Sequence, residues 1–306
     1  HFSDMGVEVA VIEVGLGGTW DSTNVIDAAV SVLTNVDLDH TAVLGDSVAA
    51  IASDKVGIFR SSGVAVLGTD DPVVSVIAQD RADALGCPLV MRGRDYSLDS
   101  NRLGVGGRVL SLHTPRAEYE DVVLSLHGIH QGANALVALV AVEEFFNRPL
   151  SEEVVRHVFA NAAMPGRMEV LENFPLILID GAHNPAGMSA LVTTLDDSFN
   201  LIGERRVVVG MLTGREVPDM IDPLVAIGVS EFIVCEPMSP RKQPAQLIAD
   251  YIVSQGARAT IELDPREAVR VARERSNDED QVIVAGSLYV VGDVRAALLA
   301  LDYQHR

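Results

Sequence analysis

Short, almost continuously apolar runs recur along the chain and alternate with stretches of helical periodicity. Residues 7–14 (VEVAVIEV) and 30–36 (VSVLTNV) are rich in β-branched side chains, which is typical of strands buried on both faces of a parallel sheet. Helical stretches such as residues 186–196 and 244–254 separate later runs of the same kind. These later runs are residues 176–179, 206–211, 231–234, 259–263 and 281–285. The alternation predicts an α/β fold, and the second half is expected to form one Rossmann-like domain with a doubly wound sheet.

A different pattern occupies residues 96–127. Turn signals at residues 99–101 (DSN) and 104–107 (GVGG) separate short runs such as residues 108–113 and 121–126. Turns at this spacing predict a small antiparallel sheet.

Two helices are expected next, over residues 133–147 and 151–162. Residues 164–167 (MPGR) then break the helical pattern, and we place a hinge there. The predicted domains are therefore residues 1–166, which contain a parallel and an antiparallel sheet, and residues 167–306, which form the Rossmann-like domain.

Charge and composition limit the partners of the chain. The 306 residues carry 43 acidic against 23 basic side chains, a formal net charge of −20, which repels polyphosphate backbones, so no nucleic-acid partner is expected. The apolar content of 48% and the charged content of 22% are ordinary for a globular protein and argue against disorder. No apolar run reaches the roughly 18 residues that a membrane span needs, so no membrane partner is expected.

The cysteines and the first residue bear on the origin of the chain. Cys87 and Cys235 are too few for a disulfide framework or a four-ligand zinc site, and they favour a reducing cytoplasm. The chain begins with His1 rather than Met and reaches a predicted strand within a few residues, which suggests an internal fragment or a processed chain. A monomer is favoured, although no sequence pattern sets the oligomeric state.

Two side chains that can bind a cation follow neighbouring predicted strands. Glu13 closes the run at residues 7–14, directly before the glycine-rich residues 15–18, and His40 follows the run at residues 30–36. Ligands bind at the carboxyl ends of strands in open α/β sheets, so Glu13 and His40 are candidate ligands of one divalent cation. Taken alone, each is more often a surface acid or a loop histidine.

Lys55 lies in a predicted helix over residues 46–59, with Asp46 as the expected N-cap. It follows Ile51 by four residues and Val48 by seven, which places it on the apolar stripe. Burial there favours the neutral amine, which can add carbon dioxide and become a carbamate able to face Mg²⁺ or position a phosphate. The alternative is that the side chain extends past the helix edge into water.

The glycine-rich residues 15–18 (GLGG) lack the third glycine of the dinucleotide fingerprint G-x-G-x-x-G. The polar residues 19–24 that follow do not favour the helix which that fingerprint requires. We interpret the segment as a turn that lets the backbone approach a ligand closely, or as plain turn chemistry. A nicotinamide-dependent oxidoreductase is accordingly disfavoured.

Asp180 directly follows the predicted strand at residues 176–179, and residues 181–185 (GAHNP) lead into a helix. Asp180 is therefore expected at the carboxyl end of a strand, beside helix N-terminal amides that can meet an anion. The alternative is an ordinary turn in which Asn184 caps a helix that begins at Pro185.

Together, these segments resemble folylpolyglutamate synthase, including its bifunctional dihydrofolate synthase form, within the Mur ligase superfamily. The resemblance covers most of the chain, and the order and separation of its blocks are far more specific than any single motif. The matching blocks are residues 13–24, 38–46, 54–58, 132–139, 165–168, 179–185, 239–241 and 286–289. The resemblance implies a partial Mur-ligase ATP-binding domain at residues 1–166 and a C-terminal ligase domain at residues 167–306.

The resemblance also implies roles for individual residues. Glu13 and His40 match magnesium ligands, Lys55 matches a carbamylated, catalytic lysine, and His183 is expected to be catalytic. Nucleotide contacts are expected at Asn134, Arg167, Asp180 and Asn184. Contacts to the pterin substrate are expected at Trp20, Asp21 and Ser22.

The implied reaction uses ATP and Mg²⁺. A substrate carboxylate attacks the γ-phosphate to give an acyl phosphate, and the amine of L-glutamate then displaces phosphate to form an amide. Magnesium and fixed cations offset the charge on the transferred phosphoryl group. The implied function is the addition of glutamate to a folate or dihydropteroate, in tetrahydrofolate polyglutamylation, dihydrofolate synthesis or both, with small molecules as partners.

Three departures from the family pattern bear on activity. The chain has no Gly-Lys dipeptide and hence no P-loop, Thr19 replaces a usual arginine, and residues 213–215 (TGR) replace a common Asp-Lys-Asp segment. Without the phosphate-binding loop, these residues alone are expected to lack turnover, although the parent protein is expected to be a ligase. The alternatives are another Mur-type amide ligase and a non-catalytic paralogue that binds nucleotide or folate.

Overall fold

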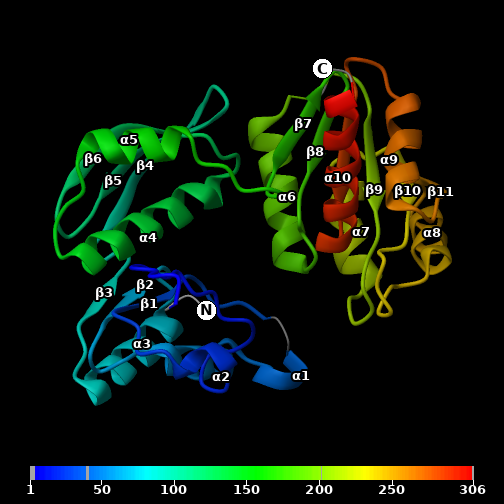
Figure 1. Ribbon diagram of the computed structural model, residues 1–306. Helices are drawn as coiled ribbons and strands as arrows, with labels where there is room; N and C mark the ends of the chain where they lie inside the picture. The colour runs from blue at the N-terminus through cyan, green and yellow to red at the C-terminus, as the bar shows by residue number, and fades with distance from the viewer. Residues whose placement is uncertain (1–3, 39–40, 201, 305–306) are drawn as a thin grey trace. The chain divides into compact units, whose positions relative to one another are not determined.

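The computed structural model describes residues 4–38, 41–200 and 202–304 (Figure 1). The chain divides into two compact units. The first contains His1–Ser100, Leu110–Val122 and Gly132–His157, and the second contains Asn101–Val109, Val123–Gln131 and Val158–Arg306. Because the second unit includes two short segments from the middle of the chain, the domain boundary at residue 166 stays a prediction.

A three-stranded parallel sheet organises residues 22–91 of the first unit. Its elements are η1 (Ser22–Val25), β1 (Val30–Leu33), α1 (Thr41–Leu44), α2 (Val48–Lys55), η2 (Val56–Ile58), β2 (Val64–Leu67), α3 (Pro72–Leu85) and β3 (Leu89–Met91). The strand order is β1-β2-β3, with Val30 opposite Val64. Residues of α2 and α3 pack against the sheet around the buried Phe59. The strand predicted at residues 30–36 is confirmed, over a shorter range.

The middle of the chain forms a second sheet, with strands in the order β4-β5-β6. Its elements and the helices after it are β4 (Ser97–Gly104), β5 (Gly107–His113), β6 (Glu118–Leu124), α4 (Ile129–Phe146) and α5 (Glu152–Ala160). Leu110 and Leu112 are buried and their neighbours in β5 are more exposed, the alternation of a strand with one face on a core. The small sheet and the two helices predicted here are confirmed. None of the described helices is long and apolar enough to cross a bilayer.

The second unit contains a six-stranded sheet in the order β11-β10-β9-β12-β8-β7. Its strands are β7 (Glu169–Asn173), β8 (Leu176–Ile179), β9 (Arg205–Val209), β10 (Glu231–Val234), β11 (Arg258–Ile261) and β12 (Gln281–Ala285). Its helices are α6 (Pro185–Ser198), α7 (Val217–Ala226), α8 (Ala245–Ser254), α9 (Pro265–Glu274) and α10 (Leu288–Gln304). Only β7 runs antiparallel among the described strands of this sheet.

Helices cover both faces of this sheet (Figure 1). Alternate residues of one strand enter different cores: Val207 and Val209 pack with α6, α7 and α8, whereas Val208 packs with α9 and α10. Burial on both faces explains why these strands are apolar without alternation. The Rossmann-like, doubly wound domain predicted for the second half is confirmed.

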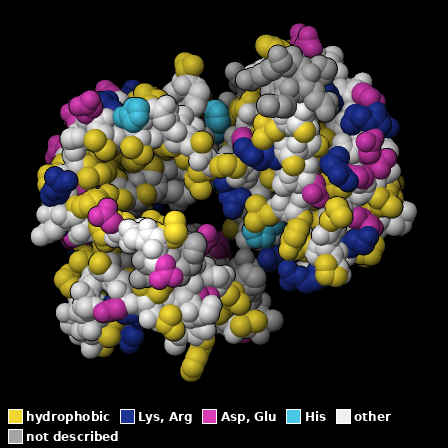
Figure 2. All heavy atoms as spheres, in the orientation of Figure 1, with side chains coloured by type: hydrophobic (Ala, Val, Ile, Leu, Met, Phe, Trp, Pro, Cys, Tyr) yellow, Lys and Arg dark blue, Asp and Glu magenta, His cyan; other side chains and the backbone are white. Residues whose placement is uncertain are grey.

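The outer face of α9 carries ion pairs between neighbouring turns. Arg270 contacts Glu267 and Glu274, three residues before it and four residues after it. Acidic and basic side chains accordingly lie side by side on this part of the surface (Figure 2). Each exposed pair contributes little to stability, so the apolar inner face of α9 dominates its packing.

The strand predicted at residues 7–14 is not formed. This segment has no regular secondary structure, and Val9 and Val11 are 52% and 97% exposed. The β-propensity of a residue reflects how well it fits a half-buried pleated surface, so a β-branched run with no described sheet partner does not become a strand.

The helix predicted over residues 46–59 begins one residue later than expected. Ser47, not Asp46, is the N-cap of α2, because Ser47 has extended backbone angles and its hydroxyl accepts the N–H of Ala50 at 3.2 Å. The helix gives way to the 3-10 turn η2 directly after Lys55.

An ionic cluster joins the amino ends of three strands in the second unit. The Arg206 guanidinium contacts the carboxylates of Asp280 at 2.7 Å, Glu204 at 2.9 Å and Glu231 at 3.2 Å. Asp280 is buried and also accepts the backbone N–H groups of Glu204 and Asn277. Desolvation opposes ionisation of Asp280, but these backbone bonds and Arg206 outweigh it and lower the pKa of the carboxyl.

Replacing Arg206 with Ala is expected to lower the free energy of unfolding by about 3 kcal/mol, because the buried Asp280 carboxylate loses its cation. Urea denaturation followed by far-UV circular dichroism measures this change. The matched control is Arg258→Ala, which removes an exposed arginine that contacts the Glu204 carboxylate at 3.7 Å and should change stability by no more than about 0.5 kcal/mol. Equal losses in the two variants would contradict the role of burial.

Candidate functional site

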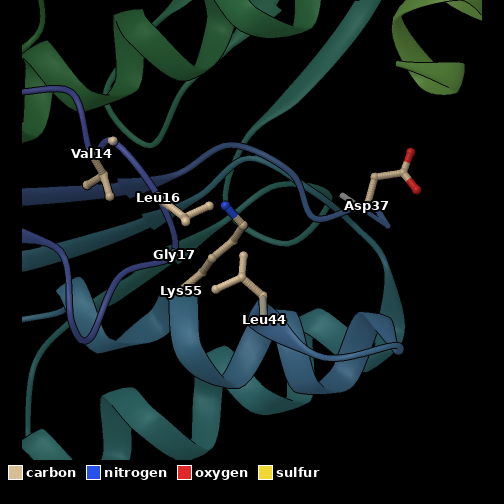
Figure 3. A pocket seen from close by; sticks show the side chains of 7 residues that line it. Val14, Leu16, Gly17, Asp37, Leu44 and Lys55 are labelled. Atoms are coloured by element: carbon tan, nitrogen blue, oxygen red, sulfur yellow. The ribbon is translucent and has the colours of Figure 1, made fainter. Parts of the chain in front are cut away.

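A pocket of about 230 Å³ lies in the first unit at the C-terminal end of α2 (Figure 3). The glycine-rich turn forms one wall, and Lys55 forms another. The lining residues are Val14, Gly15, Leu16, Gly17, Asp37, Leu44 and Lys55. The structure thus brings together two segments that the sequence analysis singled out separately.

Lys55 is the last residue of α2 and is half-buried. Its neighbours Ile51 and Val56 are buried, whereas its own side chain extends into the pocket, with the amine toward Leu16 (Figure 3). Among the described residues, no side chain or backbone group makes a hydrogen bond or ion pair with this amine. The Lys55 amine is therefore accessible to a ligand in the pocket. The sequence left burial on the apolar stripe and extension into water as alternatives, and the half-buried side chain lies between the two.

The glycine-rich turn packs directly against the main chain of α2. A Cβ atom on Gly18 would lie 2.6 Å from the carbonyl oxygen of Lys55, so a side chain there requires the backbone to shift. Gly17 has a φ of +71°, and a Cβ atom on it would clash with the carboxylate of Asp54. These glycines thus allow close packing against the helix end that bears Lys55, and the predicted approach of this backbone to a ligand stays a prediction.

Asp21 holds this turn through its carboxylate. Oδ2 accepts the backbone N–H groups of Gly15 at 3.1 Å and Leu16 at 3.0 Å. Oδ1 accepts the hydroxyl of Thr23 at 2.6 Å and its N–H at 2.8 Å. The Thr23 hydroxyl bond and then the backbone bonds stabilise the ionised form and lower the pKa of Asp21 to about 2.

The other two predicted pterin contacts lie at the surface. The indole of Trp20 is 92% exposed, and Ser22 is exposed at the start of η1. Trp20 therefore presents a flat apolar face to solvent close in sequence to the pocket wall, whereas the carboxylate of Asp21 is engaged within the turn.

The predicted magnesium ligands are only partly described. Glu13 is exposed and does not line the pocket, and His40 lies outside the described residues. Within the described ranges, no group of three or more His, Cys, Asp and Glu side chains could hold a metal ion. Asp37 lines the pocket and was missed by the sequence analysis, although it follows β1 in the same segment as His40.

Asp37 fits one requirement of a magnesium site. Mg²⁺ is often held by one or two carboxylates with waters and substrate phosphates, so a single pocket carboxylate is a suitable donor. In Figure 3 the Asp37 carboxylate points away from the Lys55 amine, and its Oδ1 accepts the N–H of Leu38 at 2.7 Å.

Asp180 is the central polar group at the carboxyl edge of the second unit. It follows β8 and is buried, with Oδ1 accepting the N–H of Ala182 and Oδ2 that of Met168, both at 2.8 Å. Desolvation raises the pKa of Asp180, and the two backbone bonds, Arg167 and His130 only partly oppose this effect.

Arg167 packs over the turn that follows Asp180. A Cβ atom on Gly181 would lie 2.1 Å from Nη1 of Arg167, so the absence of a side chain at Gly181 makes room for the guanidinium. The N–H of Gly181 also donates to the carbonyl oxygen of Gly166 at 2.8 Å. The two sequence blocks that contain Arg167 and Asp180 are thus adjacent in space.

His130 joins this cluster without having been predicted. Desolvation and, less strongly, Arg167 lower its pKa, whereas Asp180 opposes the shift. His130 lies near the start of α4, in a segment whose sequence contains no pattern that pairs it with Arg167 or Asp180.

The turn before α6 determines the roles open to His183 and Asn184. Nδ1 of His183 lies 2.8 Å from the carbonyl oxygen of Gly181, and since a carbonyl only accepts, Nδ1 carries the proton. In the neutral ring, Nε2 is then the free acceptor. Asn184 caps α6, with Oδ1 accepting the N–H of Gly187 at 2.8 Å and Pro185 as the first helical residue. The helix cap by Asn184 and the start of α6 at Pro185 agree with the alternative given from the sequence, an ordinary turn.

Asn134 lies on the exposed side of α4, in the first unit. The remaining predicted nucleotide residues, Arg167, Asp180 and Asn184, belong to the second unit. Their contacts with a nucleotide remain predictions.

Comparison with known proteins identifies the family. Residues 1–142 match the Mur ligase middle domain, and residues 166–288 match the Mur ligase glutamate ligase domain. Folylpolyglutamate synthase from Lacticaseibacillus casei is 32% identical over 302 residues, which cover 98% of this chain and 69% of that protein. This chain belongs to the folylpolyglutamate synthase family of Mur ligases.

Further relatives agree with that assignment. The dihydrofolate synthase/folylpolyglutamate synthase of Mycobacterium tuberculosis is 37% identical over 260 residues, 81% of this chain and 53% of that protein. The structure of Mycobacterium tuberculosis folylpolyglutamate synthase complexed with ADP superposes with a TM-score of 0.90 at 33% identity, covering 97% of this chain and 69% of that chain. The resemblance and the fold class stated from the sequence are confirmed. The chain spans about half to two thirds of the length of these relatives.

Replacing Asp21 with Asn is expected to destabilise the turn in a pH-dependent manner. Because the folded-state pKa of about 2 lies below the ordinary 3.8, the ionised carboxylate stabilises the folded chain above about pH 4 and loses that effect as the pH falls toward 2. The difference in unfolding midpoint between wild type and Asp21→Asn should therefore be full near neutral pH and shrink in strong acid. Far-UV circular dichroism follows the unfolding. Asp46→Asn, at an exposed acid, is the control, and a pH-independent difference for Asp21→Asn would count against this interpretation.

Proposed function

We propose that the protein is an ATP-dependent ligase that adds L-glutamate to the carboxylate of a folate or dihydropteroate through an acyl phosphate. The observation that carries the proposal is a lysine-bearing pocket and an Arg167–Asp180 cluster within a folylpolyglutamate synthase fold. The relative of known structure that binds ADP supports the same nucleotide for this chain. A cytoplasmic location is also proposed, supported by two cysteines that are buried and unpaired.

Asp180 and Arg167 are the proposed nucleotide contacts of the second unit. Each Asp180 oxygen accepts one backbone N–H and retains a lone pair, which suits a ribose hydroxyl. The Arg167 guanidinium provides a planar cation for a phosphate or an adenine ring. Asn134 and Asn184 carry the same proposed role from the resemblance.

Magnesium is proposed to bind at Glu13 and His40, and Asp37 is the further pocket carboxylate that fits it. When bound, the ion offsets the negative charge of the transferred phosphoryl group. Asp37 supplies a hard oxygen donor of the kind that Mg²⁺ prefers, and Lys55 faces the same pocket.

The composition of the chain favours an amine-specific role for Lys55. Only two of the 23 basic side chains are lysines, Lys55 and Lys242, and the other 21 are arginines. A position that needs only positive charge is therefore usually arginine here, whereas carbamate formation requires a primary amine. The neutral amine adds to the carbon of carbon dioxide and releases one proton, which gives the proposed carbamate anion.

His183 is proposed to accept a proton during amide formation. With Nδ1–H held by the Gly181 carbonyl, Nε2 is available to take the proton that the glutamate amine loses as it attacks the acyl phosphate. The new C–N bond forms as the C–O bond to phosphate breaks, so the amide and inorganic phosphate are the products. Trp20 offers its exposed face for stacking of the pterin ring.

ATP-dependent incorporation of labelled glutamate by the complete natural polypeptide that contains these residues tests the proposal. Dihydropteroate, dihydrofolate, tetrahydrofolate and a cell-wall nucleotide precursor serve as alternative acceptors. Lys55→Ala should lower turnover by about 10²- to 10³-fold, because a charged group near the reacting phosphate is lost. Lys242→Arg is the matched control at the other lysine. Incorporation into the cell-wall precursor alone, or full turnover in Lys55→Ala, would contradict the proposal.

The carbamate has its own test, which does not need turnover. In buffer with ¹³C-bicarbonate, carbon NMR of the chain should show a carbamate resonance that persists in Lys242→Arg and is lost in Lys55→Arg, because arginine retains the charge without the amine. Since these are the only lysines, the two variants assign any lysine carbamate, whereas a carbamate on the N-terminal α-amino group persists in both variants. If no carbamate resonance is lost in Lys55→Arg, carbamylation at Lys55 is refuted.

A further inference from the structure

Residues 19–26 run beside the C-terminal end of α2, and we call them the strap. At one end, the N–H and hydroxyl of Thr19 both donate to the carbonyl oxygen of Asp54, at 3.1 and 3.0 Å. At the other end, Nε of Arg60 donates to the carbonyl oxygen of Ile26 at 3.0 Å. The strap is therefore tied to α2 and to the residues just after it at both ends.

Asn24 connects these two attachments. Its Nδ2 donates to the carbonyl oxygens of Thr19 at 3.1 Å and Gly57 at 3.3 Å. Its Oδ1 and its carbonyl oxygen accept from Nη2 of Arg60 at 2.6 and 2.5 Å. Nη1 of Arg60 in turn donates to Gly57 at 3.2 Å. One guanidinium thus bonds both to the strap and to the turn that ends α2.

We propose that Arg60 is a positioning residue that holds the strap, and with it the glycine-rich wall of the pocket, against the backbone of Lys55. The functional part of this inference rests on the proposed function, whereas the structural part does not. Gly18 precedes the strap directly and packs on the Lys55 carbonyl, so a displaced strap carries the pocket wall with it.

The chemistry of the contact requires arginine. Three nitrogens of one planar group donate to acceptors on Ile26, Gly57 and Asn24, and Nη1 also donates to the carbonyl oxygen of the preceding residue, Phe59, at 3.4 Å. A lysine ammonium in the same place is a single point and cannot reach all three in their present geometry. Removal of the guanidinium also takes this donor from the partly buried carbonyl oxygen of Asn24.

The chain contains two convenient reporters for this inference. Trp20 is the sole tryptophan and lies in the strap, so a change in its fluorescence anisotropy between variants of equal size reports a change in motion of the strap. Lys55 and Lys242 are the only lysines, so acetylation of Lys55 can be measured by mass spectrometry against Lys242 as an internal reference. Buffer free of carbon dioxide keeps the Lys55 amine available for this labelling.

Arg60→Ala, Arg60→Lys and the milder Asn24→Ala are the test variants, measured on folded protein as judged by circular dichroism. We expect the Trp20 anisotropy to fall in all three, and the acetylation rate of Lys55 relative to Lys242 to rise several-fold. Arg156→Ala is the matched control. Arg156 also donates to backbone carbonyl oxygens, those of Glu120 and Asp121, but bonds to no residue of the strap.

Two results would overturn the proposal. If the Trp20 anisotropy of Asn24→Ala and of either Arg60 variant equals that of the wild type, the guanidinium does not hold the strap. A fall in anisotropy with unchanged Lys55 labelling would show that the strap moves without the pocket wall. Neither readout depends on ligase activity, so a lack of glutamate incorporation in wild type would reject the proposed function and leave this inference to be judged by the two reporters.

Discussion

The contact between Thr19 and the carbonyl oxygen of Asp54 fixes the geometry on which the pocket depends. The last carbonyl groups of a helix have no partner within the helix, so a donor from elsewhere in the chain stabilises its end. Here that donor belongs to the segment that follows the glycine-rich turn, and Gly17 and Gly18 allow the two main chains to touch. These contacts therefore fix the main chain of Lys55 against the glycine-rich wall of the pocket.

The sequence was most informative where strands are buried on both faces. The runs at residues 231–234 and 281–285 coincide with β10 and β12, because a strand between two helical layers must be apolar at every position. The run at residues 7–14 has the same composition and forms no strand, since composition does not specify a sheet partner. The one-residue error at the start of α2 has a local cause, because Asp46 and Ser47 are both good caps and only the backbone conformation selects between them.

Residues of the candidate site could be predicted from the sequence where they lie within a short motif of a few residues. Lys55, Arg167 and Asp180 were identified in this way, and the structure places the last two together. The sequence did not reveal three further residues, because each depends on a residue that is distant in the chain. Arg60 bonds to Asn24, His130 interacts with Asp180, and Asp37 lines the same pocket as Lys55. Asp21 was expected to meet substrate, and the structure gives its carboxylate four hydrogen bonds within the turn.

The exposed run at residues 7–14 has a consequence for handling the chain. In the described sheet, β1 has a hydrogen-bonded neighbour on one side only, and unpaired strand edges are templates for pairing between molecules. A β-branched run in the same unit adds to this tendency toward aggregation. The net charge of −20 acts against it through repulsion between copies. Salt screens that repulsion, so the colloidal behaviour of this chain is governed by ionic strength.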